Sequence, residues 1–277
     1  MTTILSTVAI VLYLLLGLLL GKRLFSGSLP LDQSSIGRQR SHKWLLPLGS
    51  IAIVTHAVVL YELIFIKSGM GLNLGFYNAA SLITWLIVLL LLIASVTKPI
   101  ENLGIVIFPL ASITLLLENL IPSSHIILTN AASELRFHIL ISILAYSLFS
   151  IAAMQAILLA IQNRFLRKKH PGGFIRALPP LETMESLLFQ MIAVGFILQT
   201  LALLTGMFYL EDMFEQHLVH KTILSIAAWC VFAILLWGRW KFGWRGRTAI
   251  RWTMTGFTIL LLSYFGSKLV LEIFLNK

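Results

Sequence analysis

Apolar residues fill eight long stretches of this chain, and short polar segments separate them. A helix needs about 20 mostly apolar residues to cross a hydrocarbon core of about 30 Å, and each stretch is close to that length. The stretches lack the alternating polarity of barrel strands, and unpaired peptide groups are costly in lipid. The pattern therefore predicts eight membrane-spanning helices, at residues 4–21, 44–66, 78–97, 102–121, 136–162, 187–209, 220–240 and 252–274.

Composition gives the same fold class. Hydrophobic residues make up 58% of the 277 residues, charged residues only 12%, and the mean hydropathy is +0.92. These values are far from those of a soluble domain, so we expect an all-α polytopic membrane bundle, with one integral-membrane domain over residues 1–277. The single cysteine, Cys230, lies in the seventh stretch and excludes a disulfide or a covalent c-type haem motif. Nucleotide-binding and metalloprotease motifs are absent, so we expect no enzymatic activity.

The basic residues fix a predicted orientation. Sixteen of the 21 lysines and arginines fall in four alternate segments between the apolar stretches. The positive-inside rule places these segments in the cytoplasm, so the net charge of +10 divides into +12 inside and −2 outside. Both termini then lie outside a bacterial inner membrane, and anionic lipid accounts for the basic charge without nucleic acid. The sixteen are Lys22, Arg23, Arg38, Arg40, Lys43, Lys98, Arg164, Arg167, Lys168, Lys169, Arg176, Arg239, Lys241, Arg245, Arg247 and Arg251.

Ionisable residues inside the apolar stretches are candidate functional residues, because each costs free energy to insert into lipid. His56 lies near the middle of the second stretch, about 18 Å from Trp44 and slightly outside the midplane. His138 lies at the outer start of the fifth stretch, while His217 and His220 mark the outer start of the seventh. The other histidines fall in loops, where we expect solvation: His42, His125 and His170.

Two interpretations of these histidines remain open. Neutral imidazole is an axial ligand of haem iron, so His56 and His138 could bind haem b, with His220 as a weaker candidate. Alternatively, they are hydrogen-bonded core residues that bridge helices. Glu62 and Glu118 near outer helix ends could relay protons, but solvation at the membrane interface is the simpler interpretation.

Three groups of motifs stand in the second half of the chain. They are His138 with Ala145-Tyr146, Pro179-Pro180-Leu-Glu182 with Gly195 and Leu204-Thr205-Gly206, and Gly243-Trp244-Arg245-Gly246-Arg247 with Ser263-Tyr264-Phe265-Gly266. These motifs resemble the cytochrome c assembly family of the CcsA and HemX type. The resemblance implies a haem-handling membrane protein that presents haem at the outer face for cytochrome c maturation, or one that influences haem biosynthesis. It carries a haem-ligand role to His138, whereas the position of His56 corresponds only loosely.

The chain also departs from that family's haem exporters. Their tryptophan-rich outer loop is replaced here by the acidic segment 210–216, and Trp237 and Leu275 stand where the exporters have histidines. The chain is therefore similar to a reduced, YpjD-like or HemX-like branch, and we expect no attachment of haem to cytochrome c. It could bind haem and assist cytochrome c biogenesis or haem homeostasis. Alternatively, it is a haem-free partner or regulatory subunit of another membrane protein, such as a transporter.

The charge division makes the topology testable. Cysteines introduced at Ser34 and Gly172, in two of the basic segments, should be shielded from a membrane-impermeant thiol reagent in intact cells. Labelling is measured before and after the membrane is permeabilised. Labelling of both positions in intact cells would reverse the predicted orientation.

Overall fold

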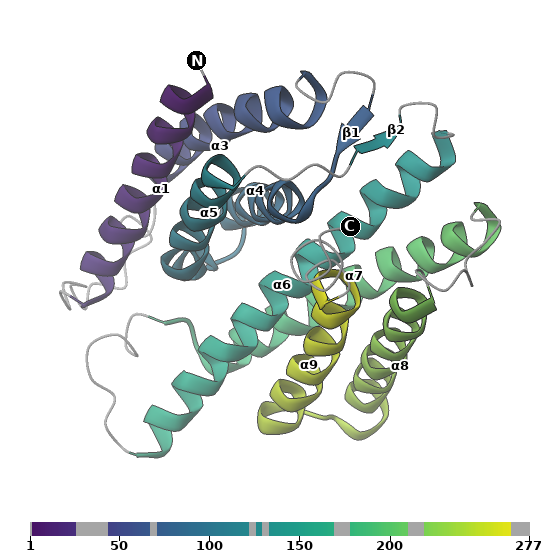
Figure 1. Ribbon diagram of the computed structural model, residues 1–277. Helices are drawn as coiled ribbons and strands as arrows, with labels where there is room; N and C mark the ends of the chain where they lie inside the picture. Colours follow the sequence, from purple (N-terminus) through teal and green to yellow (C-terminus); the bar gives the residue numbers. More distant parts are fainter. Residues whose placement is uncertain are drawn as a thin grey trace. The chain divides into compact units, whose positions relative to one another are not determined.

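Helices form nearly all of the described chain. A computed structural model describes residues 2–25, 44–66, 71–121, 126–128, 133–168, 178–209 and 219–266. Within these residues, seven helices are long and apolar enough to cross a membrane. These seven are α1 Thr2–Phe25, α3 Leu45–Tyr61, α4 Phe76–Ser95, α5 Gly104–Leu120, α6 Ser133–Arg167, α7 Leu181–Tyr209 and α8 Val219–Phe242, some of them extended by a short turn (Figure 1). A further helix, α9 Gly246–Leu261, has 16 residues.

Short elements extend or connect these helices. A 3-10 turn, Glu101–Leu103, precedes α5, and π-helical turns follow α3 at Glu62–Ile66 and α9 at Leu262–Gly266. Strands β1 Gly71–Asn73 and β2 Ile126–Leu128 form an antiparallel pair, with Gly71 opposite Leu128.

Seven of the eight predicted spans are confirmed within the described residues, with differences at their ends. The second prediction, 44–66, matches α3 and its π turn closely. Helix α6 begins and ends beyond the predicted 136–162, whereas α7 begins before the predicted 187–209 and ends with it. Backbone hydrogen bonding continues past the hydrocarbon region, which hydropathy alone does not register. The eighth prediction, 252–274, begins within α9, and its part after Gly266 lies outside the described residues.

The described helices fall into two compact units. The first contains Met1–Thr129 and Lys168–Pro179, and the second contains Asn130–Arg167 and Pro180–Lys277. Helices α1, α3, α4 and α5 belong to the first unit, and α6 to α9 to the second. The single integral-membrane domain over residues 1–277 stays a prediction.

In the first unit, α1 packs against α3 and α5, and α4 also packs against α3 and α5. Ala9, Val59 and Leu115 form a fully buried cluster from α1, α3 and α5. Gly49 allows the close approach of α3 to α4, because a Cβ there would lie 2.6 Å from the side chain of Leu92. Small residues at such contacts let lipid-embedded helices gain van der Waals packing.

The second unit is built around two stacked rings. Phe149 of α6 and Phe232 of α8 stack with centroids 4.0 Å apart. Gly195 of α7 lies against the first ring and Gly256 of α9 against the second, where added Cβ atoms would approach to 3.2 and 2.8 Å. All four helices of the unit therefore meet at this pair.

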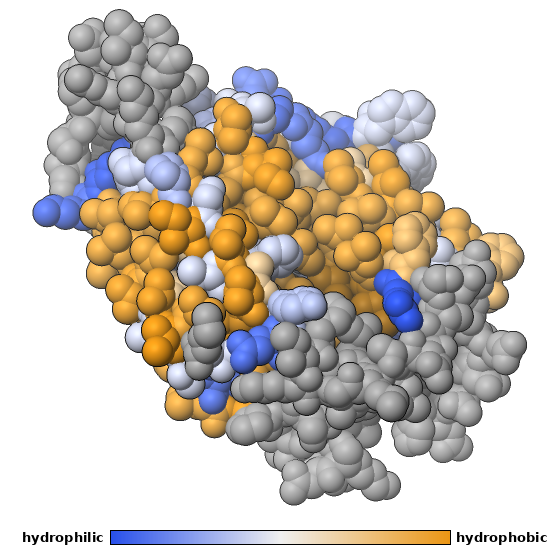
Figure 2. Space-filling model, turned by 90° about the horizontal axis from the view of Figure 1, so that it is seen from above, coloured by the Kyte–Doolittle hydropathy of each residue, from blue (hydrophilic) through white to orange (hydrophobic). Residues whose placement is uncertain are grey.

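The outward faces of the helices are apolar. Figure 2 shows hydrophobic residues over most of the coloured surface, and large side chains such as Leu18 and Phe208 are 73% and 76% exposed. Such a surface suits contact with lipid tails. Because lipid is as apolar as these side chains, close packing and polar contacts must hold the helices together.

Candidate functional site

His56 lies on the buried face of α3. The buried positions Leu45, Gly49, Ala52, His56 and Val59 are spaced by alternating steps of four and three residues, which places them on one side of the helix. The ring of His56 is completely buried. This histidine therefore points into the protein and not into lipid.

Both ring nitrogens of His56 have hydrogen-bond partners. The Tyr13 hydroxyl of α1 lies 3.1 Å from Nδ1, and the Ser81 hydroxyl of α4 lies 2.9 Å from Nε2. Tyr13 is itself fully buried, meets the His56 ring edge-on and stacks on Phe108 of α5. If the Tyr13 hydroxyl donates to Nδ1, then Nε2–H donates to Ser81, and both nitrogens of the buried ring are satisfied. In this arrangement neither nitrogen offers a lone pair to a metal.

Glu118 of α5 adds a carboxyl group to this cluster. It is only 5% exposed, and neither carboxylate oxygen has a hydrogen-bond partner among the described residues. The Ser81 hydroxyl lies beside it without a hydrogen bond of good geometry. The expectation that Glu118 is solvated at a helix end is therefore wrong, because α5 turns this residue toward α4. Tyr13, His56, Ser81 and Glu118 form one polar cluster, with one residue from each long helix of the first unit.

His138 has a different environment in the second unit. It is half-buried on α6, and its Nδ1 lies 3.1 Å from the Thr205 hydroxyl of α7. Thr205 donates its own proton to the carbonyls of Leu201 and Ala202, so it accepts a hydrogen bond from His138 Nδ1–H. This tautomer leaves the lone pair on Nε2, and metal-binding histidines are usually oriented through their other nitrogen in this way.

The two predicted haem ligands belong to different units. His56 belongs to the first unit and His138 to the second, so their pairing stays a prediction. The backbone of His220 lies in the first turn of α8, but its side chain is outside the described part of the chain. His42, His125, His170 and His217 also lie outside it.

Two of the sequence motifs contact each other. Tyr146 of α6, from the Ala-Tyr motif, packs against Phe257 of α9 and against Tyr264 and Phe265 of the following π turn. The ring centroids are 5.7 to 6.0 Å apart. Tyr146 is eight residues after His138 on the same helix, about 12 Å farther along its axis, and it contacts α9 where His138 contacts α7. The aromatic cluster around Tyr146 therefore lies about two helical turns farther along α6 than His138.

The Gly-Trp-Arg-Gly-Arg motif forms the turn between α8 and α9. Gly243 adopts the left-handed conformation, with φ +63°, and its N–H donates to the carbonyl of Arg239, which ends α8. The Trp244 ring then covers Gly238, where a Cβ would lie 2.4 Å from it, and stacks on Trp252 of α9. The motif therefore fixes the direction in which α9 leaves α8.

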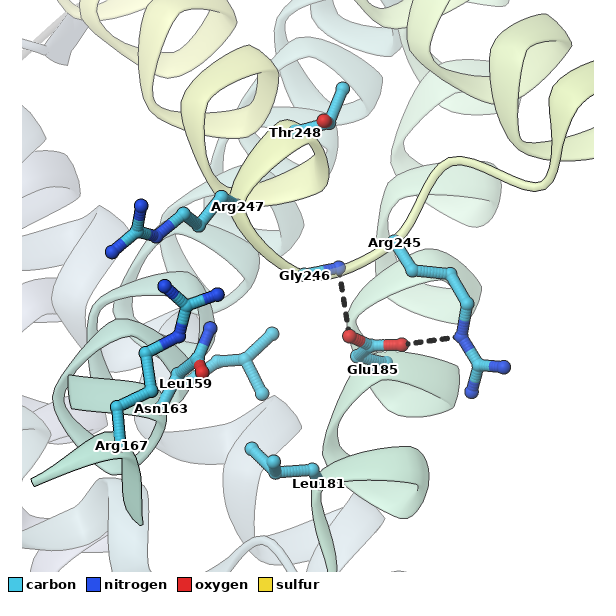
Figure 3. Close-up of a pocket in the computed structure, with 9 residues that line it drawn as sticks. All are labelled: Leu159, Asn163, Arg167, Leu181, Glu185, Arg245, Gly246, Arg247 and Thr248. Carbon is cyan, nitrogen blue, oxygen red and sulfur yellow. Dashed lines mark hydrogen bonds and ion pairs between the residues drawn. The ribbon is translucent and has the colours of Figure 1, made fainter. Parts of the chain in front are cut away.

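A carboxylate from another helix holds the end of this turn. Glu185 of α7 accepts hydrogen bonds from Arg245 Nε at 2.9 Å and from Gly246 N–H at 2.8 Å (Figure 3). Glu182 lies farther away, at 3.6 Å from the Arg245 guanidinium. The hydrogen bond to Glu185 raises the pKa of Arg245 above its ordinary value, so this side chain stays charged. Sequence reasoning missed this contact, because the partners are 60 residues apart.

Residues 44–275 match the model of a protein family described as Cytochrome C assembly protein. The chain belongs to that family. The matched residues include all three groups of motifs on which the resemblance rests, so the resemblance is confirmed.

Individual relatives agree with this assignment. The chain is 34% identical to inner membrane protein YpjD of Escherichia coli (strain K12) over 223 residues, which cover 80% of this chain and 84% of the relative. It is 26% identical to cytochrome c biogenesis protein CcsA of Prochlorococcus marinus (strain AS9601) over 200 residues, which cover 63% and 62%. No solved structure matches the chain. The family member described here is thus an integral inner-membrane protein, as predicted.

The polar cluster gives a stability prediction. Tyr13→Phe removes the hydroxyl that donates to His56 and leaves a buried ring nitrogen without a partner. We expect the free energy of unfolding to fall by on the order of 1 kcal/mol, as is usual for a hydrogen bond inside a membrane bundle. Tyr77→Phe is the matched control, because the Tyr77 ring packs on Phe76 and its hydroxyl bonds to no described residue. Equal unfolding curves for Tyr13→Phe and wild type in one detergent would contradict the assigned hydrogen bond.

The contact of Glu185 gives a second prediction. Glu185→Ala should lower the free energy of unfolding by about 1 to 2 kcal/mol, because the Gly246 N–H loses its acceptor and α9 loses a link to α7. Glu182→Ala removes the same charge from an exposed, more distant position and should change stability by less than about 0.5 kcal/mol. If the two variants unfold alike, Glu185 has no special role in this turn.

Proposed function

We propose that this protein binds haem b in the inner membrane and uses His138 as an axial ligand, in support of cytochrome c biogenesis or haem homeostasis. The observation that carries the proposal is the hydrogen bond of His138 to Thr205, which leaves a lone pair on Nε2. Family membership supports a relationship to haem, since a CcsA protein is named for cytochrome c biogenesis. The role is binding or presentation, and no catalytic step is assigned.

The surroundings of His138 support this assignment. A haem ligand in a membrane protein needs a neutral imidazole beside apolar or aromatic walls. The half-buried position of His138 leaves its ring accessible, and the aromatic residues around Tyr146 lie farther along the same helix. Haem would bind through iron at Nε2, while Thr205 would hold the ring orientation.

His56 is proposed as the second axial ligand, but it must first exchange a hydrogen bond. Either Tyr13 or Ser81 would have to leave its ring nitrogen before iron could bind. This requirement favours a second candidate function, in which His56 is a structural residue and the protein is a haem-free partner or regulatory subunit of another membrane protein. The two candidates differ in one measurable property, the presence of haem in the purified protein.

The absorption spectrum of protein purified in detergent from haem-replete cells tests the proposal. We expect a Soret band with b-type α and β bands, and a low-spin six-coordinate spectrum if both histidines bind iron. His138→Ala should lose haem or become high-spin, and His56→Ala should do the same only if His56 is the second ligand. His42→Ala and His170→Ala should have no effect. A wild-type protein without any haem would favour the partner function.

A variant of Thr205 tests the orientation of His138 more specifically. Thr205→Val keeps the side-chain shape but removes the acceptor for Nδ1–H, and loss of such a contact typically weakens binding by about 10-fold to 100-fold. Thr205→Ser keeps the hydroxyl and should retain wild-type haem affinity. Haem titration of the apoprotein measures both. Equal affinity of the Val and Ser variants would show that Thr205 does not orient a ligand.

A further inference from the structure

A pocket lies where one end of α6 meets the beginnings of α7 and α9, within the second unit (Figure 3). Its volume is about 390 Å³. Leu159 and Leu181 form an apolar part of its wall, and Asn163 and Thr248 supply polar groups. In the predicted topology this end of the unit faces the cytoplasm. The pocket is separate from His138, which lies near the opposite end of α6.

Three arginines line the pocket, and only one of them is neutralised. Both carboxylate oxygens of Glu185 are occupied, one by Arg245 and one by the Gly246 N–H. Arg167 and Arg247 are exposed and have no ion pair or hydrogen bond to any residue that the structure describes. Figure 3 shows both guanidinium groups on the side of the pocket away from Arg245. Two like charges that line one pocket repel each other unless an anion lies between them.

We propose that this pocket binds a phosphate group between Arg167 and Arg247. The planar guanidinium group donates paired hydrogen bonds whose spacing matches phosphate oxygens, so two such groups can hold one phosphate from both sides. The Asn163 amide and the Thr248 hydroxyl line the same pocket and can donate further hydrogen bonds. The proposal does not depend on haem, because the pocket lies at the opposite end of α6 from His138.

The phosphate can come from an anionic lipid headgroup or from a phosphate in the cytosol. The exposed apolar residues Ile161, Phe165 and Leu166 lead along α6 to Arg167. A lipid tail could therefore follow this helix while its headgroup occupies the pocket, as basic pockets at the cytoplasmic ends of membrane helices allow. This continuity favours the lipid source.

Binding to the delipidated full-length protein, measured by native mass spectrometry, tests the proposal. The probes are dioleoyl phosphatidylglycerol, inorganic phosphate, and dioleoylglycerol as a lipid without phosphate. Wild type should bind phosphatidylglycerol in preference to dioleoylglycerol, and Arg167→Gln/Arg247→Gln should weaken that binding at least about tenfold. Binding of inorganic phosphate that is lost in the same variant, without preferential lipid binding, would identify the cytosolic source.

The matched control removes two charges from the same helices outside the pocket. Arg164→Gln/Arg251→Gln should bind as wild type does, and Arg167→Lys/Arg247→Lys, which keeps the charge but not the paired donors, should bind more weakly than wild type. If the glutamine variant does not fold, the folded lysine variant decides the question. Three outcomes would overturn the proposal. The pocket variants bind both probes as wild type does, the control variant loses as much binding as the pocket variants, or wild type binds neither probe.

Discussion

The absence of water inside the bilayer is the constraint on which this structure depends. A buried polar group there must find its partner within the protein, or it costs free energy on insertion. The backbone meets this requirement by forming helices, and many serine and threonine side chains meet it by donating to a carbonyl in the preceding turn, as Ser147 and Thr253 do. The remaining polar side chains must pair between helices. Their positions therefore show where the helices of each unit are specifically joined.

The two central histidines show why depth in the membrane does not determine chemistry. Both lie in the predicted outer half, and sequence reasoning treated them as equivalent apart from the resemblance at His138. Their hydrogen-bond partners distinguish them: Tyr13 and Ser81 use both nitrogens of His56, whereas Thr205 uses only Nδ1 of His138. A polar residue such as Tyr13 within an apolar stretch was the available signal. Which histidine it contacts depends on how α1 packs against α3, and one sequence does not reveal that.

The helices themselves could be predicted because hydropathy and membrane thickness set both their number and their length. The errors concern side chains whose environment depends on a second helix. Glu118 was interpreted as solvated from its position near a helix end, yet the packing of α4 on α5 buries it beside Ser81. Glu185 received no role, although it holds the first turn of α9. In each case the missing information was which helix packs against the residue.

The motifs that carry the family resemblance have structural roles that differ from ligand binding. Gly243 ends α8, Trp244 covers Gly238, and Arg245 joins the turn to α7, while Tyr146 connects α6 to the π turn after α9. These contacts join the helices of the second unit, in which α6 packs against α7 and Thr205 lies beside His138. A chain can therefore retain these motifs and one oriented histidine while lacking the exporters' tryptophan-rich loop. The retained motifs alone consequently support a shared scaffold, and the proposed haem function depends on the orientation of the His138 ring.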